Sequence, residues 1–372
     1  MCAVLRGEGA SLDHLTTPES IRRFQELAVH HGLGPLLSMR LKAARPSDAA
    51  DVASLAPSRL VSDGAAIELV RTRELNRVLG ALASSGVQPL VLKGAALAHS
   101  LYPSPPMRPR VDADLLIPGD GRESVDRSLA DLGYEKQNSV SGKLVSYQHG
   151  YVHWDRFGIE HVLDVHWRIS NSQQFSRVLD YETLLMRSLP IPALGKHARG
   201  LAMPDALLLA CMHRVHHLHR PFRIGRASMR GVDRLIWIYD IHLLVEAMTG
   251  DELLEFARLS ARSGMLAVSR DGLVTAARCF GTRIPQRLLD AHRSSKAGDR
   301  SERYLRTGRS RAFANELLSL PRWRDRIALV GEHLFPSAEY MLSKYSVRNR
   351  AWLPILYVQR GIHGTWKRLL NS

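Results

Sequence analysis

Residues 91–118 read VLKGAALAHSLYPSPPMRPRVDADLLIP and place two aspartates, Asp112 and Asp114, at alternate positions of an apolar run. Residues two apart in a β-strand project from the same face, about 7 Å apart along the chain. The apolar residues between them fill the opposite face, so the run predicts a core strand with one charged side. Neighbouring carboxylates repel each other unless a cation joins them, which points to metal chemistry. An isolated D-x-D motif is also typical of a solvated strand edge.

A third carboxylate lies in IEHVLDVHWRI, residues 159–169, where Asp164 and His166 share one face and apolar residues alternate with them. If this strand pairs beside the first, Asp112, Asp114 and Asp164 converge on two divalent ions. Such ions lie roughly 3.5–4 Å apart in sites for phosphoryl transfer. Hard oxygen ligands favour magnesium or manganese.

The spacing of apolar residues predicts the elements around these strands. Two helices are expected within residues 18–45 and one each within 58–85, 94–101 and 124–133, with a strand over 87–92 and a hairpin within 144–169. Strand signals stop beyond Asn171, residues 180–372 read as mostly helical, and the charged stretch Ala291 to Arg311 is the candidate linker or loop. The sequence therefore predicts an α+β fold, a small mixed sheet with N-terminal helices and a large helical C-terminal region, divided into residues 1–85, 86–170 and 171–372.

The chain of 372 residues carries a net charge of +15, which attracts polyanions such as nucleoside triphosphates, nucleic acids or acidic lipid. Arginines lie beside aromatic residues at 219–234 and 344–352, but no nucleic-acid-binding motif is visible, and the Ala, Arg and Leu bias is also typical of high-GC bacteria. Three cysteines show no pairing or metal-like spacing, and we find neither a signal peptide nor an apolar run of membrane-span length. These features predict a soluble, cytoplasmic protein with no membrane partner.

Taken together, the motifs resemble a bacterial group within the nucleotidyltransferase superfamily that is marked by a Lys-Gly-Ala turn. The ordered series spans roughly residues 25–245 and is far more specific than any single motif. It consists of Leu92-Lys93-Gly94-Ala95-Ala96-Leu97, Tyr102-Pro103, Arg108, Asp112-Ala113-Asp114-Leu115-Leu116-Ile117, Asp164-Val165-His166-Trp167, His213 to His217 and Trp237 to Asp240. One departure is that Lys93-Gly94 stands where the wider superfamily usually has Gly-Ser or Gly-Gly.

The resemblance implies a polymerase-β-like core and a transferase that moves a nucleoside monophosphate from a nucleoside triphosphate, such as ATP, to an acceptor and releases pyrophosphate. A small molecule or a peptide is the favoured acceptor, with RNA or protein as alternatives. Two other functions stay open. One is a phosphotransferase of the same fold, and the other is a basic RNA-binding or partner-binding protein with a vestigial site.

The resemblance also implies roles for the motif residues. The carboxylates expected to bind two Mg²⁺ or Mn²⁺ ions are Asp112, Asp114 and Asp164, and Asp164 would accept the proton of the attacking group. The residues expected to hold phosphates are Lys93, Gly94 and Arg108. A solvated lysine at a strand end is the alternative for Lys93. His166 is expected to orient Asp164 or to make a purely structural hydrogen bond.

Two apolar helices in the second half carry further candidates. His213 and His217 lie at i and i+4 on one helix face, a spacing that binds zinc when another ligand joins, but no H-E-x-x-H glutamate accompanies them. We therefore expect a structural or nucleotide-contacting role. Asp240 lies inside an apolar helix, where a carboxylate needs a partner, and His213, His217 or Arg234 are the candidates. The alternative is that Asp240 holds substrate or metal at the mouth of the cleft.

Overall fold

A seven-stranded mixed sheet forms the centre of the computed structural model, which describes residues 1–8, 15, 17–44, 58–140, 142–219, 222–224, 227–229, 233–293, 300–306 and 312–369. Its strands are β1 (Leu90–Leu92), β2 (Asp112–Leu116), β3 (Glu135–Lys136), β4 (Gln148–Trp154), β5 (Glu160–His166), β6 (Leu189–Pro190) and β7 (Arg199–Gly200). They lie in the order β3-β4-β5-β2-β1-β7-β6, and a separate hairpin pairs β8 (Phe222–Ile224) with β9 (Ala227–Met229). The predicted α+β class is therefore confirmed.

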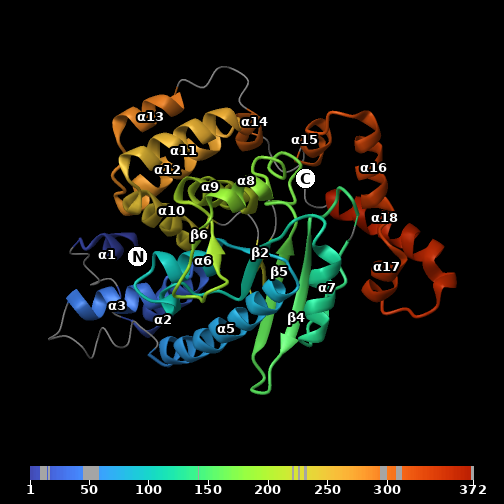
Figure 1. Cartoon of the computed structure of the whole chain (residues 1–372), viewed down its shortest axis with the longest axis horizontal. Helices are drawn as coiled ribbons and strands as arrows, with labels where there is room; N and C mark the ends of the chain where they lie inside the picture. The colour runs from blue at the N-terminus through green and yellow to red at the C-terminus, as the bar shows by residue number, and fades with distance from the viewer. Residues whose placement is uncertain are drawn as a thin grey trace.

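Helices from the first half of the chain pack beside and across this sheet (Figure 1). They are α1 (Cys2–Arg6), α2 (Pro18–His31), α3 (Gly34–Ala44), α5 (Ser58–Ser84), α6 (Lys93–Ser100), the 3₁₀ turn η1 (Pro105–Met107) and α7 (Arg122–Asp131). Thr17 begins α2 with a capping box to Ser20, and Gly32 ends it in the left-handed conformation, as the residue types favour. The helix predicted over residues 58–85 is confirmed as α5.

The two faces of the sheet have different chemistry. Apolar residues of β1, β2 and β5 share one buried core with α5 and α7, and α5 contributes Leu75, Val78, Leu79 and Leu82 at helical spacing. The other face carries the aspartates of β2 and β5, and it faces the helices that follow the sheet in the chain. The alternation of apolar and charged residues predicted from the sequence therefore separates a face that packs in the core from a face that carries the aspartates.

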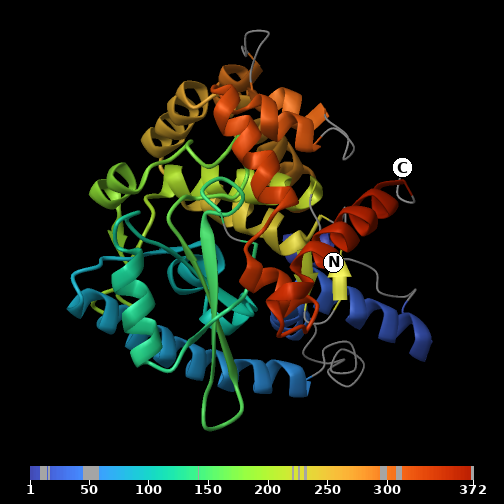
Figure 2. The same ribbon diagram turned by 90° about the vertical axis from the view of Figure 1, so that its right-hand side faces the viewer.

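The second half of the chain is largely helical. Its elements are α8 (Tyr181–Arg187), α9 (Met203–His219), α10 (Leu235–Ala247), α11 (Gly250–Arg262), α12 (Leu266–Phe280), α13 (Gln286–Arg293), α14 (Arg300–Arg306), α15 (Ala312–Leu318), α16 (Trp323–Leu334), α17 (Ala338–Lys344), η3 (Arg350–Trp352) and α18 (Leu353–Leu369). Helices α9 to α12 pack together above the sheet, whereas α16 to α18 project to one side of it (Figures 1 and 2). Among the described residues, no helix has the length and apolarity required to cross a bilayer.

Two expectations about the second half were wrong. Strands β6 and β7 lie beyond Asn171 and extend the sheet, but each has two residues, which is too short for a visible alternation. The predicted linker from Ala291 to Arg311 contains helix α14, whose Tyr304 is buried against Phe175. Tyr304, Ser301 and Leu305 anchor that helix, and so few packed residues in a charged stretch did not reveal it. Residues 294–299 and 307–311 lie outside the described part of the chain.

A buried ion pair joins the loop before β2 to helix α10. The Arg108 guanidinium donates to Asp240 from Nη2 to Oδ2 at 2.7 Å and from Nε to Oδ1 at 3.0 Å, and the Tyr102 hydroxyl donates to Oδ1 at 2.7 Å. Arg108 and Asp240 are both less than a tenth exposed. The expected partners of Asp240, which were His213, His217 and Arg234, were therefore wrong. Its true partners come from a proline-rich loop 132 residues or more away, which local spacing cannot indicate.

Replacing one partner of this pair should destabilise the fold. Arg108→Met leaves the Asp240 carboxylate buried with a hydroxyl as its partner, so the free energy of unfolding should fall by about 3–5 kcal/mol. Adding Asp240→Asn removes the buried charge and should recover part of the loss. Urea denaturation followed by circular dichroism measures both changes. A loss below about 1 kcal/mol for Arg108→Met, as surface ion pairs give, would contradict the assignment.

Candidate functional site

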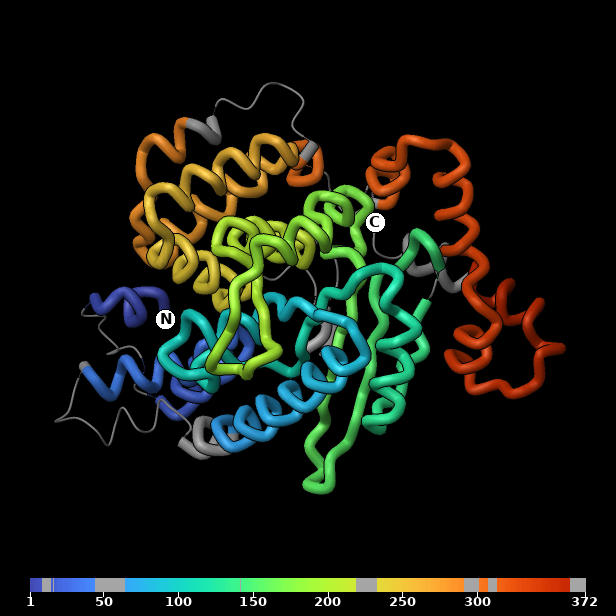
Figure 3. The backbone as a smooth tube through the Cα atoms, in the orientation of Figure 1, coloured from blue at the N-terminus to red at the C-terminus, as the bar shows by residue number. Residues whose placement is uncertain are grey.

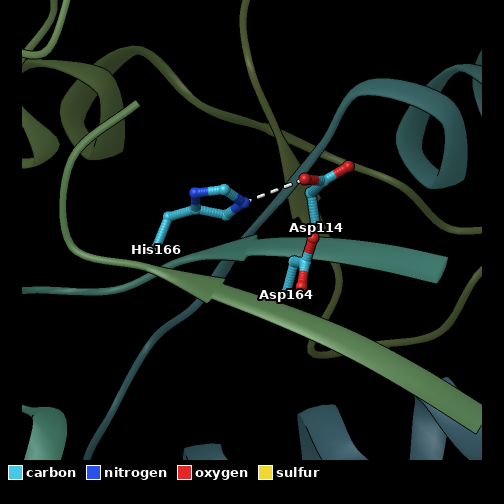
Figure 4. Close-up of side chains that lie close together, drawn as sticks. All are labelled: Asp114, Asp164 and His166. Carbon is cyan, nitrogen blue, oxygen red and sulfur yellow. Dashed lines mark hydrogen bonds and ion pairs between the residues drawn. The ribbon is translucent and has the colours of Figure 1, made fainter. Parts of the chain in front are cut away.

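The pairing of β2 with β5 brings two aspartates together. The strands run parallel with Asp114 opposite Asp164 and Leu116 opposite His166, so the predicted neighbouring strands are confirmed. Figure 4 shows the side chains of Asp114, Asp164 and His166 on one side of the two strands. Their possible ligand atoms all lie within 4.8 Å of one another. Asp112, predicted as a third ligand, lines the same cavity but lies outside this group.

Asp114 is the centre of the hydrogen bonding at this site. Its Oδ1 atom accepts from Lys93 Nζ at 2.6 Å and from His166 Nε2 at 2.9 Å. Burial alone would raise the pKa of Asp114, but the Lys93 ammonium and the His166 hydrogen bond outweigh it and hold the pKa well below its usual value. The carboxylate of Asp114 is therefore ionised and fixed in place.

The expectation that His166 orients Asp164 was wrong. Asp164 and His166 project from the same face of one strand and their ligand atoms lie within 4.8 Å of each other, but His166 Nδ1 has no hydrogen-bond partner among the described residues. His166 lies opposite Leu116, two residues along β2 from Asp114, and its ring reaches across the two strands to Asp114. His166 also supplies a nitrogen to the possible metal group, a role that the sequence analysis did not assign although the shared face of the strand indicated it.

Lys93 has a side chain that is only 17% exposed and pairs with Asp114, so the alternative of a solvated lysine was wrong. It follows Leu92, which lies opposite Asp114 in the antiparallel pair of β1 and β2. Its backbone has a φ of 51°, a left-handed conformation that costs energy for a residue with a side chain. Burial lowers the pKa of Lys93, but the Asp114 carboxylate more than reverses this and the pKa is raised. The turn thus directs a charged ammonium onto Asp114.

Close packing against Arg108 explains why residue 94 is a glycine. A Cβ atom at this position would lie 2.8 Å from Nη1 of Arg108, too close for the guanidinium to stay where it is. The glycine therefore allows Arg108 to pack against the first turn of α6 while it binds Asp240. Because the guanidinium is engaged with Asp240, the expected phosphate contact of Arg108 stays a prediction.

The carboxylates of the cavity repel one another. Burial and the charge of Asp114 raise the pKa of Asp112. Burial, together with Asp114 and Asp112, raises the pKa of Asp164 to about 7. A divalent cation between these groups would offset the repulsion, and oxygen donors with one imidazole suit such an ion. The residues present therefore fit a metal ion.

The aspartates lie in a cavity of about 620 Å³. Helices α9 and α10 form part of its wall, where His213, His217 and Trp237 contribute their rings. The rings of His217 and Trp237 stack with centroids 5.1 Å apart, and burial holds the pKa of His213 well below its usual value. In the described part of the chain, these histidines belong to no group of three metal-ligating side chains, so the zinc interpretation gains no support.

An ion-paired cluster on α5 forms another part of the wall and was missed by the sequence analysis. Arg110 pairs with Glu68 at 2.9 Å, both side chains are buried, and Arg71 donates to the backbone carbonyl of Arg110. All three residues line the cavity. The spacing of Glu68 and Arg71 fits an ordinary helix surface, so nothing in the sequence marked them as wall residues. Asp240 does not line this cavity but an adjoining one of about 120 Å³.

Comparison with known proteins agrees with this geometry. A family model described as an uncharacterised nucleotidyltransferase matches residues 17–281. No curated protein matches the chain. The matched range includes the sheet, the group around Asp114 and the cavity walls from α2 to α10, and it stops before α13. The chain therefore belongs to this family of nucleotidyltransferases.

Proposed function

We propose that the protein is a metal-dependent nucleotidyltransferase that transfers a nucleoside monophosphate from a triphosphate, such as ATP, to an acceptor and releases pyrophosphate. The observation that carries this proposal is that Asp114 lies opposite Asp164 on paired strands, beside a large cavity. The volume of about 620 Å³ lies within the range of small-molecule and cofactor sites, about 300–1,000 Å³. Membership of the family supports the class of reaction.

The carboxylates would hold two Mg²⁺ or Mn²⁺ ions: Asp112, Asp114 and Asp164. When bound, such ions neutralise phosphate charge and stabilise the attacking and leaving oxygens. Asp164 takes the proton of the acceptor as the acceptor oxygen or nitrogen bonds to the α-phosphorus. The bond from that phosphorus to the bridging oxygen breaks, and its electron pair leaves with pyrophosphate. His166 keeps Asp114 in position throughout.

The start of α6 would hold the phosphates. Lys93 presents an ammonium there, and Gly94 leaves room for the Arg108 guanidinium against the first turn, whose N–H groups would add to the attraction for an anion. Arg108 would act mainly through Asp240, by fixing the loop before β2. The rings of His213, His217 and Trp237 line the cavity and would contact the nucleobase. A small molecule or a peptide is the proposed acceptor, with RNA or protein as alternatives.

Nucleotide binding should depend on both the metal and the paired aspartates. Calorimetric titration of ATP, GTP, CTP and UTP into the wild type with Mg²⁺ should show binding of at least one, and addition of EDTA should abolish it. Asp114→Asn/Asp164→Asn should lose the metal-dependent binding, because the excess negative charge that attracts the ion is gone. Asp131→Asn, an exposed position on α7, is the matched control and should bind as the wild type does. Absence of binding to all four triphosphates would refute the proposal.

The label carried to the product distinguishes nucleotidyl transfer from phosphoryl transfer. We expect label from the α-phosphate to enter acceptor molecules in an extract of the producing cells, with release of pyrophosphate. Label from the γ-phosphate should leave in pyrophosphate, because the bond that breaks lies between the α- and β-phosphates. Transfer of γ-label to an acceptor would instead establish the phosphotransferase alternative. Asp131→Asn again serves as the control that retains transfer.

A further inference from the structure

The helices α15 to α18, which we call the C-terminal arm, lie beyond the range that matches the family model. Figure 1 shows α16 to α18 to one side of the sheet. The arm exposes large apolar side chains, between 51% and 68% accessible, along its length: Leu318, Trp323, Ile327, Leu334, Phe335, Trp352, Ile355 and Val358. Large apolar side chains that gather on a protein surface mark interaction sites.

These side chains follow helical spacing and form two stripes. Trp323, Ile327 and Leu334 share one face of α16, because they are separated by four and seven residues. Trp352, the last residue of η3, and Ile355 and Val358 of α18 follow each other at intervals of three. The opposite faces are packed, since Leu329 and Leu356 are buried. The arm therefore has buried apolar residues that pack against the protein and a second set of apolar residues that faces solvent.

Positive charge accompanies the apolar stripes. Residues 320–361 contain seven arginines and lysines against three acidic residues. Arg322, Arg324, Arg348 and Arg350 are exposed, and none forms an ion pair with a residue that the structure describes. The guanidinium of Arg324 lies over the ring of Trp323, 5.6 Å from its centroid. The arm thus offers an uncompensated cationic rim beside exposed aromatic and aliphatic groups.

We infer that the C-terminal arm binds an anionic lipid surface. Helices with arginines on the polar side and Trp, Phe and Leu on the other lie in the membrane interface without crossing the bilayer. RNA would use the arginines and the aromatic rings but would gain nothing from Ile327, Ile355 or Val358, because aliphatic groups do not stack bases. A second copy of a chain with net charge +15 would meet like charge. The expectation of no membrane partner rested on the length needed for a span, which does not apply to interfacial binding.

Hydrogen bonds connect the arm to loops around the candidate active site. The Glu332 carboxylate of α16 accepts from the backbone N–H groups of Lys143, Leu144 and Val145 at 2.8–2.9 Å. Glu316 of α15 accepts from the Ser172 hydroxyl at 2.8 Å, next to Asn171, which lines the large cavity. The arm is therefore tied to the loop at residues 143–145 and, through Ser172, to the loop whose Asn171 lines the large cavity.

Sedimentation with sucrose-loaded vesicles tests the inference without reference to any enzymatic activity. The wild type should pellet with phosphatidylglycerol–phosphatidylcholine vesicles and not with phosphatidylcholine alone, and binding should weaken as salt is raised. Trp323→Ser/Ile327→Ser should lower the partition coefficient by about tenfold or more, because two anchoring side chains are lost. Arg322→Gln/Arg324→Gln should weaken binding to the anionic vesicles. These positions are exposed, and circular dichroism verifies that the variants fold.

The matched control is Trp154→Ser/Phe157→Ser, which removes two equally exposed apolar side chains from the β4–β5 hairpin. That hairpin extends away from the arm, as the backbone trace in Figure 3 shows, so this variant should bind vesicles as the wild type does. Failure of the wild type to pellet with anionic vesicles would overturn the inference, as would full binding by the α16 variant. Loss in the α16 variant of RNA binding or of dimer formation, with no vesicle binding by the wild type, would assign the arm to those partners instead.

Discussion

The charge of Asp114 is the constraint on which the site and much of the fold depend. A buried carboxylate costs several kcal/mol unless it is paired, and two donors reach it from different directions. The antiparallel pair of β1 and β2 delivers Lys93, and the parallel pair of β2 and β5 delivers His166. Both pairings require β2 between its two neighbours, so the position of this carboxylate fixes the centre of the sheet. The left-handed backbone of Lys93 is part of the same requirement, because an extended continuation of β1 would carry the ammonium past Asp114.

The distribution of charge around the sheet follows from these pairs. Arg108 neutralises Asp240 and is held by the loop before β2, so in the proposed reaction it would act mainly by fixing that loop, and its contact with phosphate stays a prediction. The phosphate charge then depends on Lys93, on the first turn of α6 and on bound metal. Asp112, Asp114 and Asp164 repel one another, which helps to raise the pKa of Asp112 and of Asp164, and this repulsion is the physical reason that a cation suits the site.

The sequence was most informative where local periodicity decides the structure. Alternation predicted both aspartate-bearing strands and their charged face, and helical spacing predicted α5, because each pattern reports which side of an element is buried. Periodicity does not report which distant group meets a side chain. It placed His166 on the face of Asp164 but could not show the diagonal to Asp114, and it placed Asp240 in a buried helix but could not show Arg108. Strands of two residues, such as β6 and β7, are too short to carry a period at all.

The basic residues behind the net charge of +15 fall into two groups, buried and exposed. Interior arginines are matched by carboxylates, as in the pairs of Arg110 with Glu68 and of Arg214 with Asp233. Exposed arginines of the C-terminal arm, such as Arg322 and Arg348, have no such partner among the described residues. Buried pairs contribute little to the field outside the protein and are weakly screened by salt, whereas exposed charges act at the surface and are strongly screened. The proposed attraction to a polyanionic surface and the proposed recognition of a nucleotide therefore depend on different charges, and ionic strength should affect the first far more than the second.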